Sequence, residues 1–332
     1  MSKNERELKL ARIGMEEIMK AMPPTYAKLF IHARRDLAEL RLKNDKQIIK
    51  IWTEAAEEIS KEMRKLGDGY RKEYLRSLLL DILKILNAEY RDLMKQDISE
   101  AIKIQYMFQK DIMASIAKEA DVTNIGPTKL AQVYTGLARE TTEAFLARKV
   151  NGISLSTRIW RNNQAVMAQV IKAATSGHLS AYDMGLMLEK YMKKDRDSLN
   201  VRESQALMEA FDGRLPKDLK YDSFRLARTE ISNAFAEGTY SAGAKNPFYL
   251  GIDWRLSGRH DPKLKCVCPQ LVGFHPKGSE PPIPHPQCMC QQLPRIKSMD
   301  TAVDEMIAWV NNPSSNRKLE DWYQNIYLKH IA

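Results

Sequence analysis

The sequence predicts a mainly α-helical protein, with long helices in the N-terminal half and then a helical module that ends in a small α+β region. Glycine is rare before residue 150, and apolar residues recur there at helical spacing. After Asn246 the chain is rich in aromatic and β-branched residues that partly alternate, which is typical of a strand. All 4 cysteines then fall within residues 266–290, a stretch rich in proline and glycine.

Residues 1–150 are predicted to form packed helices rather than one extended coiled coil, because no heptad pattern is sustained. Two apolar stripes mark the longest helices. The first contains Leu29, Phe30, Ala33, Leu37 and Leu40, and the second contains Leu75, Leu78, Leu79, Ile82, Ile85 and Leu86. Helix breaks are expected at Pro23–Pro24, at Gly67–Gly69 and near Gly126, because proline removes a backbone donor and glycine favours turns.

Residues 151–298 are predicted to form a second module. Ser154 or Ser156 is expected to cap its first helix and Ser180 the next, because a serine hydroxyl can accept a bond from a free helix N–H group. A later helix carries an apolar stripe that consists of Phe224, Ala227, Ile231, Ala234 and Phe235.

Arg228 and Glu230 lie on the same helix but two residues apart, so they cannot share a helix face, and each is expected to pair with a different neighbour. A strand through Trp254 then leads into a cysteine- and histidine-rich knuckle at residues 254–294. Residues 299–332 are predicted to form a tail with two short amphipathic helices.

The chain has 52 basic and 42 acidic side chains, which gives a formal net charge of +10. This excess favours a polyanionic partner such as DNA, RNA or an acidic protein face, although a solvated helical surface has a similar composition. One segment is more strongly basic, and its cations are the candidate contacts to DNA or to an acidic protein. They are Arg255, Arg259, Lys263, Lys265 and Lys277.

The sequence also argues against a membrane protein. It contains no run of about 18 apolar residues, so no transmembrane helix is expected. Its first residues lack the apolar core of a signal peptide, so we expect the chain to be made and folded in the cytoplasm.

The cysteine-rich window has the ligand types that zinc prefers, namely thiolate sulfur and imidazole nitrogen. Its candidate ligands are Cys266, Cys268, His285, Cys288 and Cys290. They form two halves, C-x-C and H-x-x-C-x-C, on either side of a proline-rich loop that is stiff and therefore loses little entropy when the site closes. Gly273 and Gly278 permit tight turns in this loop.

We therefore predict a structural zinc site and a zinc-knuckle-like region, with Cys266, Cys268, Cys288 and either His285 or Cys290 as ligands. A catalytic zinc would need an open position and a nearby general base, and no such base stands at a recognisable spacing. Disulfides, which suit a protein outside the cell, and free thiols are the alternatives.

A metal-dependent nuclease is the alternative function. The sequence "RHD" places His260 beside Asp261, close to the predicted metal site. A His-Asp pair in a polar loop is also common without any catalytic role, so we expect no enzymatic activity.

The motifs in the second module resemble those of phage head morphogenesis proteins, the Mu F-like minor capsid family. The resemblance rests on three segments in order: "GISLSTRIWRNNQAVMAQVIKAATSGHLS", "FRLARTEISNAFAEG", and the window with Trp254, Asp261, Cys268, Gly273 and "PPIPHPQCMC". It covers about Asn151 to Pro294. The chain departs from the family pattern at its first cysteine, which would fall at Lys265, whereas here Cys266 compresses the half-site to C-x-C.

This resemblance implies a minor structural protein of the virion that aids head assembly and DNA packaging or delivery. It implies portal protein and capsid or scaffolding proteins as partners, non-specific affinity for double-stranded DNA, and no membrane or small-molecule substrate. The protein is expected in the capsid interior or at the portal vertex, and in the host cytoplasm during assembly. A basic chain without a base-reading motif suits non-specific DNA contact, because phosphate attraction is independent of sequence.

Overall fold

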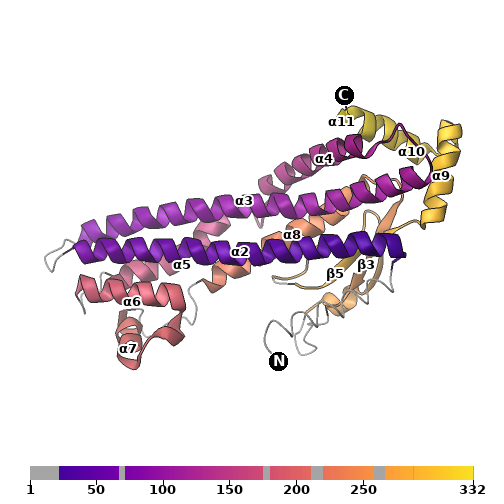
Figure 1. Ribbon diagram of the computed structural model, residues 1–332. Coiled ribbons are helices and arrows are strands. Elements are labelled where there is room, and N and C mark those ends of the chain that lie inside the picture. The colour runs from indigo at the N-terminus through magenta and orange to yellow at the C-terminus, as the bar shows by residue number, and fades with distance from the viewer. Residues whose placement is uncertain are drawn as a thin grey trace. The chain divides into compact units, whose positions relative to one another are not determined.

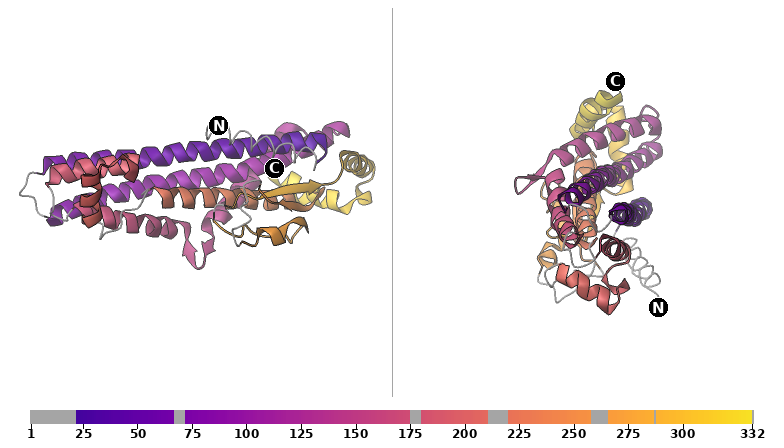
Figure 2. Two further views of the ribbon diagram at one scale, coloured as in Figure 1. Left: turned by 90° about the horizontal axis from the view of Figure 1, so that it is seen from below. Right: turned by 90° about the vertical axis from the view of Figure 1, so that its left-hand side faces the viewer.

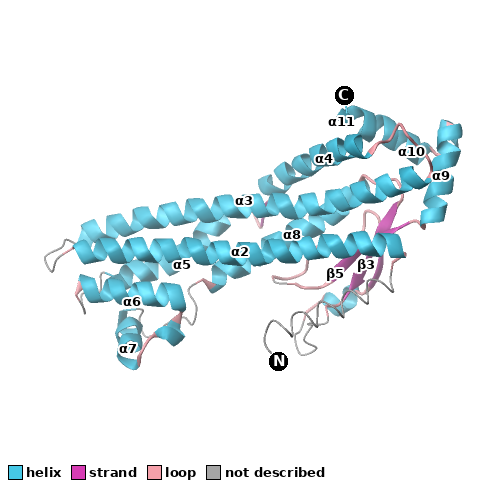
Figure 3. Cartoon of the chain, in the orientation of Figure 1, coloured by secondary structure: helices cyan, strands magenta, loops and turns pink. Residues whose placement is uncertain are grey.

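The protein is mainly helical, with long N-terminal helices and a small C-terminal antiparallel sheet, as the sequence predicts (Figure 3). The computed structural model describes residues 22–66, 72–174, 180–210, 220–257, 266–286 and 288–331. The chain divides into two compact units: unit 1 is Met1–Leu40, Asp97–Leu146 and Thr229–Ala332, and unit 2 is Arg41–Gln96 and Ala147–Arg228. These units follow contacts between segments, so the boundaries expected at residues 150 and 298 stay predictions.

The first half of the chain consists of helices that begin and end close to the breaks expected at Pro23–Pro24 and Gly126, while the break expected at Gly67–Gly69 lies outside the described residues. They are α2 (Pro24–Lys65), α3 (Lys72–Glu119) and α4 (Pro127–Ala147) (Figure 1). In the first stripe Phe30, Ala33, Leu37 and Leu40 are buried. The second stripe needs a correction, because Ile85 is 61% exposed whereas Leu83 is 1% exposed. The stripe expected on α3 therefore follows Leu83 rather than Ile85.

Most of the remaining elements are also helices, and they lie both before and after the C-terminal sheet. The helices are α5 (Leu155–Ala174), α6 (Ala181–Lys194), α7 (Val201–Ala210), α8 (Tyr221–Ala244), α9 (Met299–Asn311), α10 (Arg317–Trp322) and α11 (Lys329–Ile331), with a π-helix, η4 (Tyr323–Leu328), between the last two. Ser154 accepts a hydrogen bond from the backbone N–H of Thr157 at 3.2 Å, and Ser180 caps α6 in the same way. None of the helices in the described part of the chain combines the length and the apolar character that a membrane span requires.

Unit 1 contains buried aromatic side chains. Phe30 and Phe108 meet edge to face, with ring centroids 5.5 Å apart. The C-terminal segment lies beside α4 (Figures 1 and 2). Gln132 of α4 donates a hydrogen bond to the His330 carbonyl. Tyr327 of η4 donates to the Asn124 carbonyl at 2.9 Å, just before α4 begins. These bonds attach the tail to the helical part of its own unit.

Unit 2 contains a continuous chain of buried hydrogen bonds. Trp52 donates to the Ser223 hydroxyl at 3.3 Å, and that hydroxyl donates to Asn163 at 3.1 Å. Asn163 in turn donates to Asn87 at 2.9 Å, while Tyr90 donates to the Ser223 carbonyl. The five residues come from α2, α3, α5 and α8. This series of hydrogen bonds therefore fixes the relative rotation of these helix segments within unit 2.

Unit 2 also holds a small hairpin of β1 (Lys149–Val150) and β2 (Ile153–Ser154). The connecting residues, Asn151 and Gly152, both have positive φ, at 53° and 75°. Asn-Gly with two positive φ angles is the preferred two-residue hairpin turn. Arg228 of α8 forms a two-point ion pair with Asp45, which supplies the separate neighbour expected for this residue.

Candidate metal centre

The three-stranded sheet brings the two halves of the cysteine window to one place. Its strands are β3 (Tyr249–Arg255), β4 (Gly273–Pro276) and β5 (Gln291–Ile296), in the order β4-β3-β5 and with both outer strands antiparallel to β3 (Figure 1). Trp254, near the end of β3, pairs with Gly273 and with Gln292. The chain therefore enters β4 and β5 from the same end of the sheet, and the cysteines that precede each strand arrive there together.

All five predicted ligand residues take part in this cluster. The ligand atoms form two groups that share Cys268, and within each group all atoms lie within 4.8 Å of one another. One group is Cys266, Cys268 and His285, and the other is Cys268, Cys288 and Cys290. The Sγ atom of Cys268 lies 3.7 Å from that of Cys288 and 3.1 Å from Nε2 of His285. The Cys/His cluster could therefore hold a metal ion such as zinc.

The histidine presents the correct ring nitrogen to the cluster. Nδ1 of His285 lies 2.9 Å from the carbonyl oxygen of Pro286. A carbonyl can only accept a hydrogen bond, so Nδ1 is the donor in this contact and Nε2 is the ring nitrogen that faces the cluster. Metal-bound histidines usually hold their second nitrogen in this way, because the bond fixes the tautomer and the ring orientation.

The sulfur atoms are shielded from water. Cys268, Cys288 and Cys290 are buried, while Cys266 and His285 are half-buried at the rim. Burial raises the pKa of Cys268 to about 12, and hydrogen bonding to Cys290 together with burial raises the pKa of Cys288. Without a cation these thiols stay protonated at neutral pH, so a metal ion is what would hold them as thiolates.

The separation of the sulfur atoms is compatible with a shared zinc ion. Two sulfurs on a tetrahedral zinc, each at about 2.3 Å from the metal, lie about 3.8 Å apart, close to the observed separation of Cys268 and Cys288. The 3.1 Å contact from Cys268 to His285 is shorter than the roughly 3.6 Å that the same geometry requires, so His285 would move slightly outward on binding. All four cysteines are free thiols, and a disulfide would need sulfurs about 2 Å apart.

The proline-rich loop between β4 and β5 is held by two tyrosines. Tyr240 of α8 donates to the Pro281 carbonyl at 2.8 Å, and Tyr249 of β3 donates to Glu280 at 3.0 Å. Burial, reinforced by the charge of Glu280, raises the pKa of both tyrosines, so both hydroxyls remain donors at neutral pH. Glu280 also accepts the backbone N–H of Gly278, whose φ of 88° turns the chain after β4. Sequence reasoning missed these anchors, because a tyrosine in a helix and another in a strand carry no local signal of a shared loop.

The two candidate DNA contacts that the structure describes, Arg255 and Lys277, lie at opposite ends of the sheet. Arg255 lies at the end of β3 where the cysteines meet, whereas Lys277 follows β4 at the other end of the sheet. The ammonium group of Lys277 donates to the Ala244 carbonyl at the end of α8, and burial lowers its pKa. Lys277 therefore also has a local role at a helix C-terminus. The remaining predicted residues, Arg259, His260, Asp261, Lys263 and Lys265, lie outside the described part of the chain.

Comparisons of the chain with models of protein families, with curated proteins and with solved structures find no match. The features of the chain that point to a function are therefore its sequence motifs and the geometry of its cysteine cluster. That geometry offers five side chains that could hold a metal ion, in two groups that share Cys268.

Proposed function

We propose that this chain is a structural, non-enzymatic minor protein of a phage head. In this role it contacts the portal protein and capsid or scaffolding proteins, binds double-stranded DNA without sequence preference, and aids head assembly and DNA packaging or delivery. It is made in the host cytoplasm and remains in the virion, in the capsid interior or at the portal vertex. This function rests on the resemblance to the Mu F-like family and on the chemistry of the C-terminal sheet.

The observation that carries the proposal is the convergence of the two cysteine half-sites. The family resemblance depends on motifs that are far apart along the chain. The two cysteine half-sites among these motifs meet in the structure, where the Sγ atoms of Cys268 and Cys288 lie 3.7 Å apart. The compressed C-x-C half-site does not prevent this meeting, because Cys266 still lies in a group with Cys268 and His285. The departure from the family pattern is therefore compatible with the same kind of site.

The bound ion in this proposal is zinc with a structural role. A catalytic zinc has three protein ligands and an open position for water, whereas a structural zinc has four. Five candidate side chains for four positions support a fully coordinated ion. A sheet of three short strands also has little core of its own, so a metal ion that joins β4 to β5 stabilises it.

Zinc content and head association test the proposal separately. We expect about one zinc ion per purified chain by mass spectrometry, and loss of that zinc in Cys268→Ser. The matched control is Val267→Ser, at an exposed position between two candidate ligands, which should keep its zinc. The head assignment predicts that the chain co-purifies with assembled heads of the phage that encodes it, and purified heads without the chain would refute it.

DNA binding and nuclease activity form the next test. We expect duplex binding that does not depend on sequence and that weakens steeply with salt, since phosphate contacts release counterions. Incubation with supercoiled plasmid and Mg²⁺, Mn²⁺ or Zn²⁺ should give no nicking by the wild type or by His260→Ala. Nicking that disappears in His260→Ala would instead establish the metal-dependent nuclease.

A further inference from the structure

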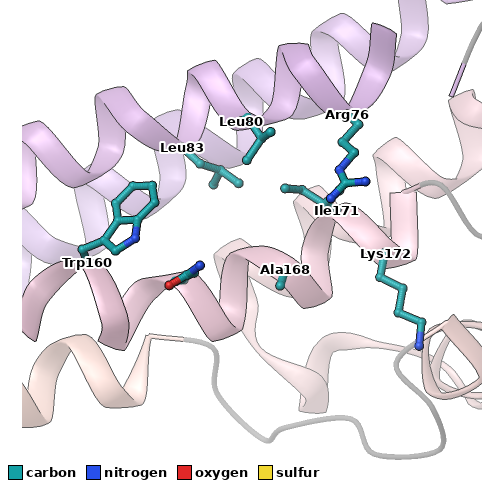
Figure 4. A pocket seen from close by; sticks show the side chains of 8 residues that line it. Arg76, Leu80, Leu83, Trp160, Ala168, Ile171 and Lys172 are labelled. Carbon is teal, nitrogen blue, oxygen red and sulfur yellow. The ribbon is translucent and has the colours of Figure 1, made fainter. Parts of the chain in front are cut away.

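Unit 2 has an apolar groove between α3 and α5 that the proposed function does not use (Figure 4). The hollow has a volume of about 380 Å³. Leu80 and Leu83 line it from α3, and Trp160 and Ile171 line it from α5. Leu80 and Trp160 are 38% and 40% exposed, although both are large apolar side chains. Exposed tryptophan and leucine in a concave site are typical of a surface that binds another apolar surface.

One end of this groove is cationic. Arg76 and Lys172 lie at the end opposite Trp160, and the guanidinium group of Arg76 points toward Ile171 (Figure 4). Arg76 forms no ion pair with any residue in the described part of the chain. The groove therefore suits an apolar segment that carries a carboxylate near one end.

Helix α9 in unit 1 has such a segment. Its buried row is Ala302, Met306 and Trp309, which accounts for its packing within its own unit. A second apolar row, Val303, Ile307 and Val310, has the same i, i+4, i+7 spacing and faces outward. Ile307 and Val310 are 41% and 46% exposed. This row has more apolar surface than a solvated helix face requires.

Acidic side chains flank the outward row. Asp300 and Asp304 are exposed and lie beside Val303 and Ile307, whereas α9 has no lysine or arginine. Within the described residues neither aspartate forms an ion pair. This local negative charge contrasts with the net charge of +10 for the chain. The helix therefore combines an apolar row with the charge opposite to that at the end of the groove.

We propose that α9 of one copy binds in the α3–α5 groove of a second copy of this chain. The apolar row enters between Leu80 and Ile171 and against Trp160, and Asp304 pairs with Arg76. The dimensions agree: Val303 to Val310 spans about 10 Å along a helix, and Trp160 to Ile171 spans about 16 Å. A helix bound in an apolar groove through i, i+4 and i+7 side chains is a common mode of recognition.

This contact is heterologous, because the two surfaces that meet are different parts of the chain. Each copy uses its groove for one neighbour and its α9 for another, so the contact can repeat into a ring or an open array. The proposal concerns association between copies and stands independently of zinc binding or of head association.

Sedimentation velocity over about a hundredfold range of protein concentration tests it. We expect the wild type to associate further as concentration rises, whereas Leu80→Asp and Ile307→Asp each associate at least tenfold more weakly. A mixture of these two variants should form dimers, because the first keeps an intact α9 and the second keeps an intact groove. Val201→Asp is the matched control, since Val201 is 76% exposed and lies outside the groove and α9.

A charge exchange makes the test specific for the proposed pair. Arg76→Glu and Asp304→Arg should each weaken association, and the chain that carries both changes should recover most of it. Circular dichroism and thermal melts confirm that all variants are folded. A monomeric wild type at every concentration, undiminished association of both aspartate variants, or a mixture of the two that stays monomeric would each overturn the proposal.

Discussion

The cysteine cluster and the polar chain of unit 2 hold buried polar groups in two different ways. In unit 2, Asn87, Asn163 and Ser223 satisfy one another through hydrogen bonds inside a large apolar core. In the C-terminal sheet, Cys268 and Cys288 are buried next to each other with raised pKa values, and their protonated thiols are weak hydrogen-bond partners. A helical core can stabilise its polar groups with its own side chains, whereas a small sheet gains more from an ion.

The largest expected effect is the loss of the metal site. Chelation, or Cys268→Ser, should open residues 266–296, because a structural zinc contributes on the order of 10 kcal/mol to the folding of small zinc domains. Proteolysis with mass spectrometry should show new cleavage in this window, while the helical circular dichroism signal changes little. The control variant Val267→Ser should remain protected from cleavage in this window, like the wild type. Unchanged protection after chelation would mean that the sheet is stable without a metal.

The next effect is smaller and falls in unit 2. Asn163→Leu leaves the Ser223 hydroxyl and Asn87 without their partner, so the free energy of unfolding should fall by about 2–4 kcal/mol. Denaturant titration measures the change, and zinc content should remain at the wild-type value. Arg161→Leu, on the exposed face of α5, should change stability by less than about 0.5 kcal/mol. If Asn163→Leu left the free energy of unfolding unchanged, the buried hydrogen bonds of Asn163 would contribute no net stability.

Weakening one anchor of the proline-rich loop should have a moderate effect. Tyr240→Phe removes the donor to the Pro281 carbonyl, which costs about 1 kcal/mol. Because this loop positions His285, zinc should also be lost faster to a competing chelator. Tyr182→Phe, at an exposed tyrosine of unit 2, serves as the control. Equal rates of zinc loss in the two variants would mean that the prolines alone fix the loop.

The smallest effects concern two similar ion pairs, one in each unit. Arg295 binds Asp253 through two hydrogen bonds and lies over the Phe274 ring, and Arg228 binds Asp45 through two. Both arginines are almost half exposed, so Arg295→Ala and Arg228→Ala should each cost at most about 1 kcal/mol, and less at high salt. Thermal melts at two salt concentrations measure this. A much larger loss for Arg295→Ala would show that the sheet depends on its surface charges.

The amino-acid sequence predicted the helices more completely than the strands. Helix periodicity located α2, α3 and α8, but over the 48 residues of α3 the buried row drifts, so Ile85 points to solvent while Leu83 is buried. Only β3 was expected from its residues. β5 contains Pro294, which argues against a strand, and the structure accommodates it because β5 lies at the edge of the sheet.

The candidate site was predictable in its members but not in its arrangement. The spacing of the cysteines and His285 identified all five side chains of the cluster. The sequence could not separate Arg255 from Lys277, because their placement at opposite ends of the sheet depends on the strand register. The sequence also could not show which of the two apolar rows of α9 faces outward, because both rows have the same spacing.

The attachment of the proline-rich loop at both ends makes its middle a spacer of set length. Tyr240 holds the loop at Pro281, and the cluster holds it again at His285, with Pro282, Ile283 and Pro284 between. Prolines keep such a segment extended at about 3.1 Å per residue. An inserted residue would push the imidazole out of the cluster while the cysteine sulfurs stayed in place, so the length of this segment sets whether nitrogen or only sulfur reaches a bound ion.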